Sequence, residues 1–278
     1  LTARVKGRCI PALQRVEPEG PNRVPAVGTA PYPAVLLLHD HGGAFDLGWC
    51  KLFGGEGSAV GLARHYGGVA PADVFRDAGF AVLCLDALGW GGRQTGGYEA
   101  QQALAANLMH LGWSLAGVVA AEDAAAAGWL AGHPEIDAAR IGAFGFSYGG
   151  FRAWQVAALS PHVRAAASVG WMARRGCLMR AGAPLLAGQS AFYMLHPGVD
   201  ADFPDLAGLA APRPLFMRSG LEDRHMPADA VAGAYEDLAR IWQAAGGPPP
   251  DTGFFPDGHV CPPDVQRAAA RFLAAALA

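Results

Sequence analysis

The segment GFSYG at residues 145–149 places a serine between two glycines in the pattern G-x-S-x-G. A serine hydroxyl becomes a nucleophile when a tight turn between a strand and a helix presents it to a nearby base. The glycines allow neighbouring backbone to approach closely, and the helix directs its positive end toward the reacting atoms. We therefore predict Ser147 as a nucleophile. The chain has 38 glycines, so a plain structural turn is the alternative.

On an open parallel sheet, such a serine is followed along the chain first by an acid and then by a histidine. Residues 171–199 contain no Asp or Glu, which moves the search for the acid to the later segment SGLEDRH at 219–225. We predict Asp223, which lies three residues after a glycine and four before a proline, with Glu222 as the alternative.

Nine histidines are present, and only His225 and His259 lie beyond this acid. His225 is two residues from Asp223 and is poorly placed to bridge to the serine. His259 follows a short apolar run, where an imidazole would reach Ser147. We therefore predict His259 as the general base.

Acyl transfer also needs backbone N–H groups that stabilise the oxyanion. We expect one donor at Tyr148, directly after the nucleophile, and the other in the segment HDHGG at 39–43, which follows an apolar run. We favour the N–H of His41, with Gly42 next. The histidines and aspartate of this segment also raise the question of a metal site. No further His or carboxylate nearby has ligand spacing, so we expect no metal.

Apolar runs alternate with helical segments, which predicts βαβ units and a mostly parallel sheet with helices on both faces. The expected strands are 34–38, 80–85, 140–144, 165–169, 214–218 and 252–255. The expected helices are one long helix within 99–131, then 148–159, 228–245 and an amphipathic helix from 263. Active sites of such sheets lie beyond the carboxyl ends of the strands, where the predicted chemistry gathers.

Two connections are long for a compact domain, and we expect them to be functional loops. The first is 44–77. The second, about 171–211, is predicted as a lid-like insertion within a single domain spanning 1–278. An extra helical layer that only packs is the alternative. We expect substrate contacts from apolar side chains of the insertion and of the segment DALGWGGR at 86–93, namely Trp171, Met172, Tyr193 and Trp90. We interpret Arg174, Arg175 and Arg180 as a solvated loop cluster, with recognition of an acidic substrate as the alternative.

Composition excludes several classes of protein. The 278 residues are 52% hydrophobic and 16% charged with a net charge of −3, which suits a large core and gives no footprint for nucleic acid. No apolar run reaches the roughly 18 residues that a membrane span needs. The five cysteines are odd in number and form no CxxC pair, which favours free thiols, with one bridge as the alternative.

Several segments resemble the dienelactone hydrolase and acetyl-xylan-esterase-like branch of the α/β hydrolases, over about residues 34–275: LLLHDHGG, DALGWGGR, RIGAFGFSYGGFRAW and FPDLAGLAAPRPL. The resemblance implies an α/β-hydrolase fold, ester hydrolysis through an acyl-enzyme and no cofactor. The chain before Pro33 is short, so we expect any initial antiparallel strands to be reduced to Thr2–Val16. Dienelactone hydrolases proper use a cysteine nucleophile, and Ser147 therefore favours a carboxylesterase.

The leading hypothesis is a serine carboxylic ester hydrolase acting on a small-molecule ester through a Ser-His-Asp triad. A prolyl-oligopeptidase-type serine peptidase is the alternative, because that family shares the GFSYGG block, and a non-catalytic binding protein on this fold is a third. The oligomeric state stays open. We take a cytoplasmic location as the working expectation, with a leader removed before Leu1 as the alternative.

Overall fold

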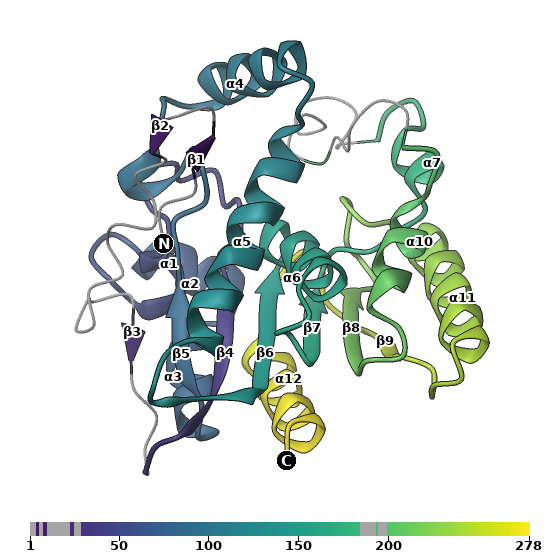
Figure 1. Ribbon diagram of the computed structural model, residues 1–278. Helices are drawn as coiled ribbons and strands as arrows, with labels where there is room; N and C mark the ends of the chain where they lie inside the picture. Colours follow the sequence, from purple (N-terminus) through teal and green to yellow (C-terminus); the bar gives the residue numbers. More distant parts are fainter. Residues whose placement is uncertain (1–3, 6–7, 10–22, 25–28, 184–192, 194–198) are drawn as a thin grey trace.

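The computed structural model describes residues 4–5, 8–9, 23–24, 29–183, 193 and 199–278. Its centre is a seven-stranded sheet with the order β3-β5-β4-β6-β7-β8-β9, which runs from left to right in Figure 1. The strands are β3 (Arg23–Val24), β4 (Tyr32–Leu38), β5 (Ala81–Cys84), β6 (Ile136–Phe146), β7 (Ala165–Val169), β8 (Leu215–Gly220) and β9 (Asp251–Phe255). All neighbouring pairs are parallel except β3 with β5, so the prediction of a mostly parallel sheet is confirmed.

The strands form here because their apolar side chains are buried on both faces of the sheet. Successive side chains of a strand point to opposite faces. In β4, Leu36 and Leu38 accordingly join one buried cluster, and Val35 and Leu37 join another. The residues of β6 and β7 beside them are buried as well, which makes this part of the sheet the centre of the core.

Helices cover both faces of the sheet. One cluster is built with residues of α1 (Cys50–Phe53), α2 (Ala59–Tyr66), α3 (Pro71–Asp77) and α12 (Pro263–Ala276). The other is built with residues of α4 (Tyr98–His110), α5 (Leu115–Ala131), α6 (Tyr148–Leu159), α7 (Arg175–Leu178), α10 (Phe203–Ala207) and α11 (Ala228–Ala244). A buried ion pair, Arg152 with Asp123, joins α6 to α5.

The prediction of one long helix within 99–131 is wrong. Two helices, α4 and α5, meet there at an angle of 89°. Gly112 adopts a positive φ of 76°, which favours glycine and ends the first helix. Ser114 then caps α5, because its side chain accepts a hydrogen bond from the N–H of Gly117.

The segment 44–77, expected to be a long functional loop, contains three helices, in line with the alternative of a helical layer, and a functional role for it stays a prediction. The helices α1, α2 and α3 fill it, and Leu52, Tyr66 and Phe75 pack in the buried cluster beneath the sheet. Of the predicted insertion at 171–211, residues 184–192 and 194–198 lie outside the described residues. Its described part contains α7 and α10.

The described part of Thr2–Val16 forms a separate antiparallel pair, β1 (Arg4–Val5) with β2 (Arg8–Cys9). The antiparallel strand that joins the central sheet is instead β3. Among the described residues, no single helix is long and apolar enough to cross a membrane, and only the sharply bent pair α4–α5 passes that test together. The side chains of four cysteines are described, and no two of them form a disulfide: Cys50, Cys84, Cys177 and Cys261.

Candidate active site

Ser147 lies at the turn between β6 and α6, where the sheet meets the helix. Its φ of 55° is the one positive value among the described non-glycine residues, and such backbone strain clusters at functional sites. The flanking glycines are required by close approach. A Cβ on Gly145 would lie 2.1 Å from the carbonyl oxygen of Gly149, and a Cβ on Gly149 would lie 1.9 Å from that of Leu38. The predicted strand–turn–helix context is therefore present.

Three predicted side chains are joined by hydrogen bonds. The Nε2 atom of His259 lies 2.8 Å from Oγ of Ser147, and its Nδ1 atom lies 2.6 Å from Oδ2 of Asp223. A carboxylate can only accept, so Nδ1 carries the proton and Nε2 is the acceptor for the serine hydroxyl. In this arrangement the imidazole is oriented to take the serine proton.

Asp223 is buried and held on its own loop after β8. Its Oδ1 atom accepts the backbone N–H groups of His225 and Met226 at 2.8 and 3.2 Å, which turns Oδ2 toward His259. The neighbouring Glu222 donates its backbone N–H to the carbonyl of Asp257, at 3.1 Å, and so ties this loop to the one that carries His259. Of the two acid candidates, the structure brings Asp223 into contact with the imidazole.

His225 lies beside the predicted base without replacing it. Its ring packs edge-on against that of His259, with 4.7 Å between the ring centroids. Burial, followed by the nearby charge of His259, lowers the pKa of His225 to about 4. His225 is thus neutral at physiological pH and forms part of the wall around His259.

The two predicted oxyanion donors lie on neighbouring elements. Tyr148 is the first residue of α6, so its backbone N–H is at the positive end of that helix. His41 follows β4, and Trp90 links the two positions. The Trp90 ring stacks on the ring of Tyr148 at 5.0 Å and its indole N–H donates to the carbonyl of His41 at 3.3 Å.

The His41 imidazole is buried among Phe45, Trp90 and Tyr98. Its Nδ1 atom accepts the N–H of Gly43 at 3.1 Å, and burial, followed by the charge of Lys51, lowers its pKa to about 4. Within the described ranges, no group of three or more His, Cys, Asp or Glu is arranged to hold a metal ion.

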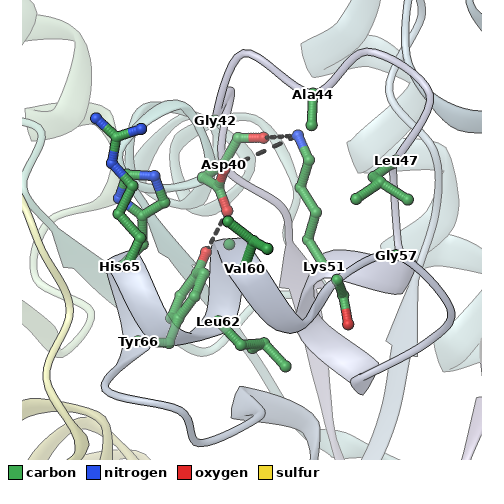
Figure 2. Close-up of a pocket in the computed structure, with 13 residues that line it drawn as sticks. Asp40, Gly42, Ala44, Leu47, Lys51, Gly57, Val60, Leu62, His65 and Tyr66 are labelled. Carbon is green, nitrogen blue, oxygen red and sulfur yellow. Dashed lines mark hydrogen bonds and ion pairs between the residues drawn. The ribbon is translucent and has the colours of Figure 1, made fainter.

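A buried polar cluster behind this loop was not predicted. The ammonium of Lys51 donates to the carbonyls of Asp40 and His41 and lies 3.8 Å from the Asp40 carboxylate, while the hydroxyl of Tyr66 donates to the other carboxylate oxygen at 2.5 Å. Figure 2 shows these side chains converging at the edge of a cavity of about 150 Å³. A single lysine in the run LGWCKLF gives no sequence signal, because an exposed lysine is the ordinary interpretation.

All four predicted substrate contacts are buried, and two of them, Trp90 and Tyr193, lie against Tyr148. Trp90 and Tyr193 contact the Tyr148 ring, with centroids at 5.0 and 5.9 Å. Trp171 packs on Phe151 at 4.3 Å, and both Trp171 and Met172 are 1% exposed in the core. All four stay predictions for substrate binding. Among the arginines, Arg174 pairs with Asp237, Arg180 pairs with Asp229, and Arg175 donates to the carbonyl of Val199.

The parallel sheet, the strained serine between β6 and α6, and the order of serine, acid and histidine along the chain define an α/β hydrolase. The chain belongs to the dienelactone hydrolase family, whose pattern matches residues 59–241. It is therefore an enzyme of the hydrolase class, as the sequence predicted.

Known proteins agree with this assignment. The Bacillus subtilis (strain 168) protein YtaP, a hydrolase by name, is 26% identical over 218 residues, which cover 78% of this chain and 69% of YtaP. A glucuronoyl esterase from Solibacter usitatus superposes with a TM-score of 0.64 at 17% identity, covering 92% of this chain and 76% of that one. Acetyl xylan esterase 1 from a Thermoanaerobacterium species gives a TM-score of 0.56 at 19% identity, covering 92% and 78%. These structural likenesses show the shared fold.

Proposed function

We propose that this protein is a serine carboxylic ester hydrolase that works through an acyl-enzyme. The observation that supports it most is the chain of hydrogen bonds from Ser147 through His259 to Asp223, with 2.8 and 2.6 Å between the heavy atoms. Family membership and the esterase names of the superposed structures support the same reaction class.

In the proposed mechanism, Oγ of Ser147 attacks the ester carbonyl carbon while Nε2 of His259 takes the hydroxyl proton. The oxyanion that forms accepts the N–H groups of Tyr148 and His41, and the Asp223 carboxylate stabilises the imidazolium. His259 then returns the proton to the leaving alcohol. A water molecule, deprotonated by the same imidazole, hydrolyses the acyl-enzyme and releases the acid. The mechanism uses no cofactor.

We propose small neutral esters as substrates. Residues 171–199 contain no Asp or Glu, so this stretch offers no carboxylate partner for the ammonium of a peptide amino terminus. Of the two acids that follow, Asp200 is exposed, and Asp202 already accepts the N–H groups of Arg175 and Phe203. An alcohol is also a better leaving group than an amine. These observations favour an esterase over a prolyl-oligopeptidase-type peptidase.

The test combines active-site labelling with two substrate panels on one preparation. A fluorophosphonate probe should label the wild type at Ser147 and leave Ser147→Ala unlabelled, which a non-catalytic binding protein would contradict. Short-chain p-nitrophenyl esters, the acetate and butyrate, should be hydrolysed with measurable kcat/KM, and aminoacyl p-nitroanilides should react little. Efficient anilide cleavage with weak ester hydrolysis would instead assign the protein to the peptidases.

A further inference from the structure

The buried ammonium of Lys51 binds two successive carbonyls of the loop after β4. Its Nζ atom donates to the carbonyl oxygen of Asp40 at 3.0 Å and to that of His41 at 2.7 Å. Lys51 is 6% exposed, and Figure 2 shows its side chain extended along the cavity with the nitrogen directed at the Asp40 segment. The ammonium therefore fixes two consecutive peptide planes.

The geometry of the peptide unit converts these contacts into a direction for the N–H groups. In a trans peptide, the C=O and the following N–H point to opposite sides. The described cis peptides lie elsewhere, before Pro31 and Pro212. Holding the carbonyls of Asp40 and His41 against Lys51 therefore points the N–H groups of His41 and Gly42 away from it. These two N–H groups are the candidate oxyanion donors.

The start of this loop also lies against the turn that carries Ser147. The first turn of α6 approaches so closely that a Cβ on Gly149 would lie 1.9 Å from the carbonyl oxygen of Leu38 and 3.2 Å from the carbonyl carbon of His39. Trp90 bridges His41 to Tyr148. The loop is thus held by the ammonium at Asp40 and His41 and by the serine turn at Leu38 and His39.

We propose that Lys51 is a positioning residue for the oxyanion site, aiming the His41 and Gly42 N–H groups and strengthening them as donors. This inference rests on the proposed function. A cation bound at a peptide carbonyl polarises the whole amide, so its N–H becomes a better donor in a buried site. Asp40 and Tyr66 stabilise the buried Lys51. The Asp40 carboxylate compensates the charge of the ammonium, and the Tyr66 hydroxyl orients that carboxylate.

Three variants distinguish a loss of loop orientation from a loss of folding. Lys51→Met keeps the length and removes the donors and the charge. The double variant Lys51→Met/Asp40→Asn does the same without leaving a buried carboxylate unpaired. Lys51→Arg keeps both charge and donors, and the adjoining cavity of about 150 Å³ gives the larger guanidinium room.

Arg213→Met is the matched control. Arg213 is also a cation bound to backbone carbonyls, those of Ser160 and Val163 at 2.9 and 2.8 Å. It precedes β8 and so lies at the amino end of the parallel strands, whereas Ser147 lies at their carboxyl end. Its loss should lower the melting temperature and leave kcat near the wild-type value.

The kinetic readout is kcat and KM on p-nitrophenyl acetate, with inhibition by butylboronic acid, whose serine adduct mimics the tetrahedral intermediate. Loss of one oxyanion donor costs about 10²–10³ in kcat. We expect both methionine variants to lose about a hundredfold in kcat with KM within about threefold, and to bind the boronic acid more weakly by a similar factor. Lys51→Arg should stay within about tenfold of wild type.

The outcomes separate the two proposals. If the double variant is folded and keeps more than about a third of the wild-type kcat, or if the boronic acid binds it as tightly as wild type, the role of Lys51 is wrong while the esterase proposal stands. If the wild type is neither labelled by the fluorophosphonate nor active on esters, the proposed function fails, and this inference fails with it.

Discussion

The orientation of the Asp223 carboxylate is fixed by its hydrogen bonds. Two backbone N–H groups occupy Oδ1, so only Oδ2 is directed at His259, and the imidazole is in turn directed at Ser147. Each of these hydrogen bonds excludes another orientation of the carboxylate or another tautomer of the imidazole. Because the members of such a chain act as a unit, the predictions at this scale concern single substitutions with large and similar effects.

The first of these concerns the nucleophile. Ser147→Ala removes the oxygen that forms the acyl-enzyme, and we expect kcat on p-nitrophenyl acetate to fall by about 10⁴–10⁶. Circular dichroism should show unchanged secondary structure, because alanine fits the same turn. A variant that keeps a tenth of the wild-type turnover would show that Ser147 is not the nucleophile.

The second separates the neighbouring histidines. His259→Ala should lose activity about as severely as Ser147→Ala, whereas His225→Ala should stay within about tenfold of wild type, or roughly 1.4 kcal/mol in the barrier. The reason is positional, since the His259 ring is hydrogen-bonded to both Ser147 and Asp223, whereas the His225 ring packs against that of His259. The measurement is kcat/KM for both variants on the same ester. The opposite ranking would assign the base to His225.

Sequence reasoning selected three side chains that the structure joins by hydrogen bonds, Ser147, His259 and Asp223, because a local motif and the order of residues along the chain point to them. It missed the contacts of Lys51 with Asp40 and of Tyr66 with Asp40. Those contacts join a loop to two helices, and no periodicity marks them. A buried lysine is recognised only when the carbonyls around it are known.

At the scale of the elements, α5 and α6 are joined by a fully buried ion pair. Arg152 binds both carboxylate oxygens of Asp123, at 2.8 and 2.7 Å, and the two side chains are 2% and 4% exposed. Burial raises the pKa of Asp123, and the adjacent guanidinium opposes that rise. The Arg152–Asp123 pair therefore fixes α6, which begins directly after Ser147, against α5.

Arg152→Met leaves the Asp123 carboxylate buried without its cation, and we expect a loss of about 3–5 kcal/mol in the free energy of unfolding. Arg152→Met/Asp123→Leu should recover most of that loss, because two apolar groups can fill the space. Denaturant titration measures both. Arg180→Met removes an exposed pair and serves as the control, with stability near wild type. If Arg152→Met were as stable as the control Arg180→Met, the prediction would be contradicted.

The elements were predictable to the extent that they are regular. The strands appeared as apolar runs, and the bounds 148–159 and 165–169 agree with α6 and β7. The three helices within 44–77 were missed because they are short and glycines separate them, so their stability comes from burial rather than from sequence periodicity. In 99–131 the abundance of alanine concealed the break at Gly112.

At the scale of the whole molecule, buried histidines couple folding to pH. Burial, followed by the charge of Lys51, lowers the pKa of His41 from 6.5 to about 4, and His39 is lowered as well, mainly by burial. Between about pH 4 and pH 6.5, the two pKa values of His41, the unfolded chain binds more protons than the folded chain. Stability therefore rises with pH in this window.

We expect the free energy of unfolding to fall as the pH is lowered from about 6.5 toward 4, with the contribution of His41 fully present above 6.5. At about 1.4 kcal/mol per pH unit, this contribution is on the order of 3 kcal/mol. Denaturant titrations at pH 7.5, 6 and 5 measure the slope. His41→Gln should reduce it, whereas Leu209→Gln, an exposed position, should not. Parallel curves for wild type and His41→Gln would contradict the assignment.

The backbone of Ser147 has a consequence for how such a chain changes over generations. A non-glycine residue at a φ of 55° and a ψ of −122° costs about 1–3 kcal/mol, and glycine would relieve much of that cost. We therefore expect Ser147→Gly to unfold at a higher temperature than wild type, although the greater freedom of glycine in the unfolded chain offsets part of the gain. Selection for stability alone would thus favour replacing Ser147, the predicted nucleophile. Only continued selection for turnover retains a serine there, so a duplicate of this gene released from that selection should lose Ser147 early.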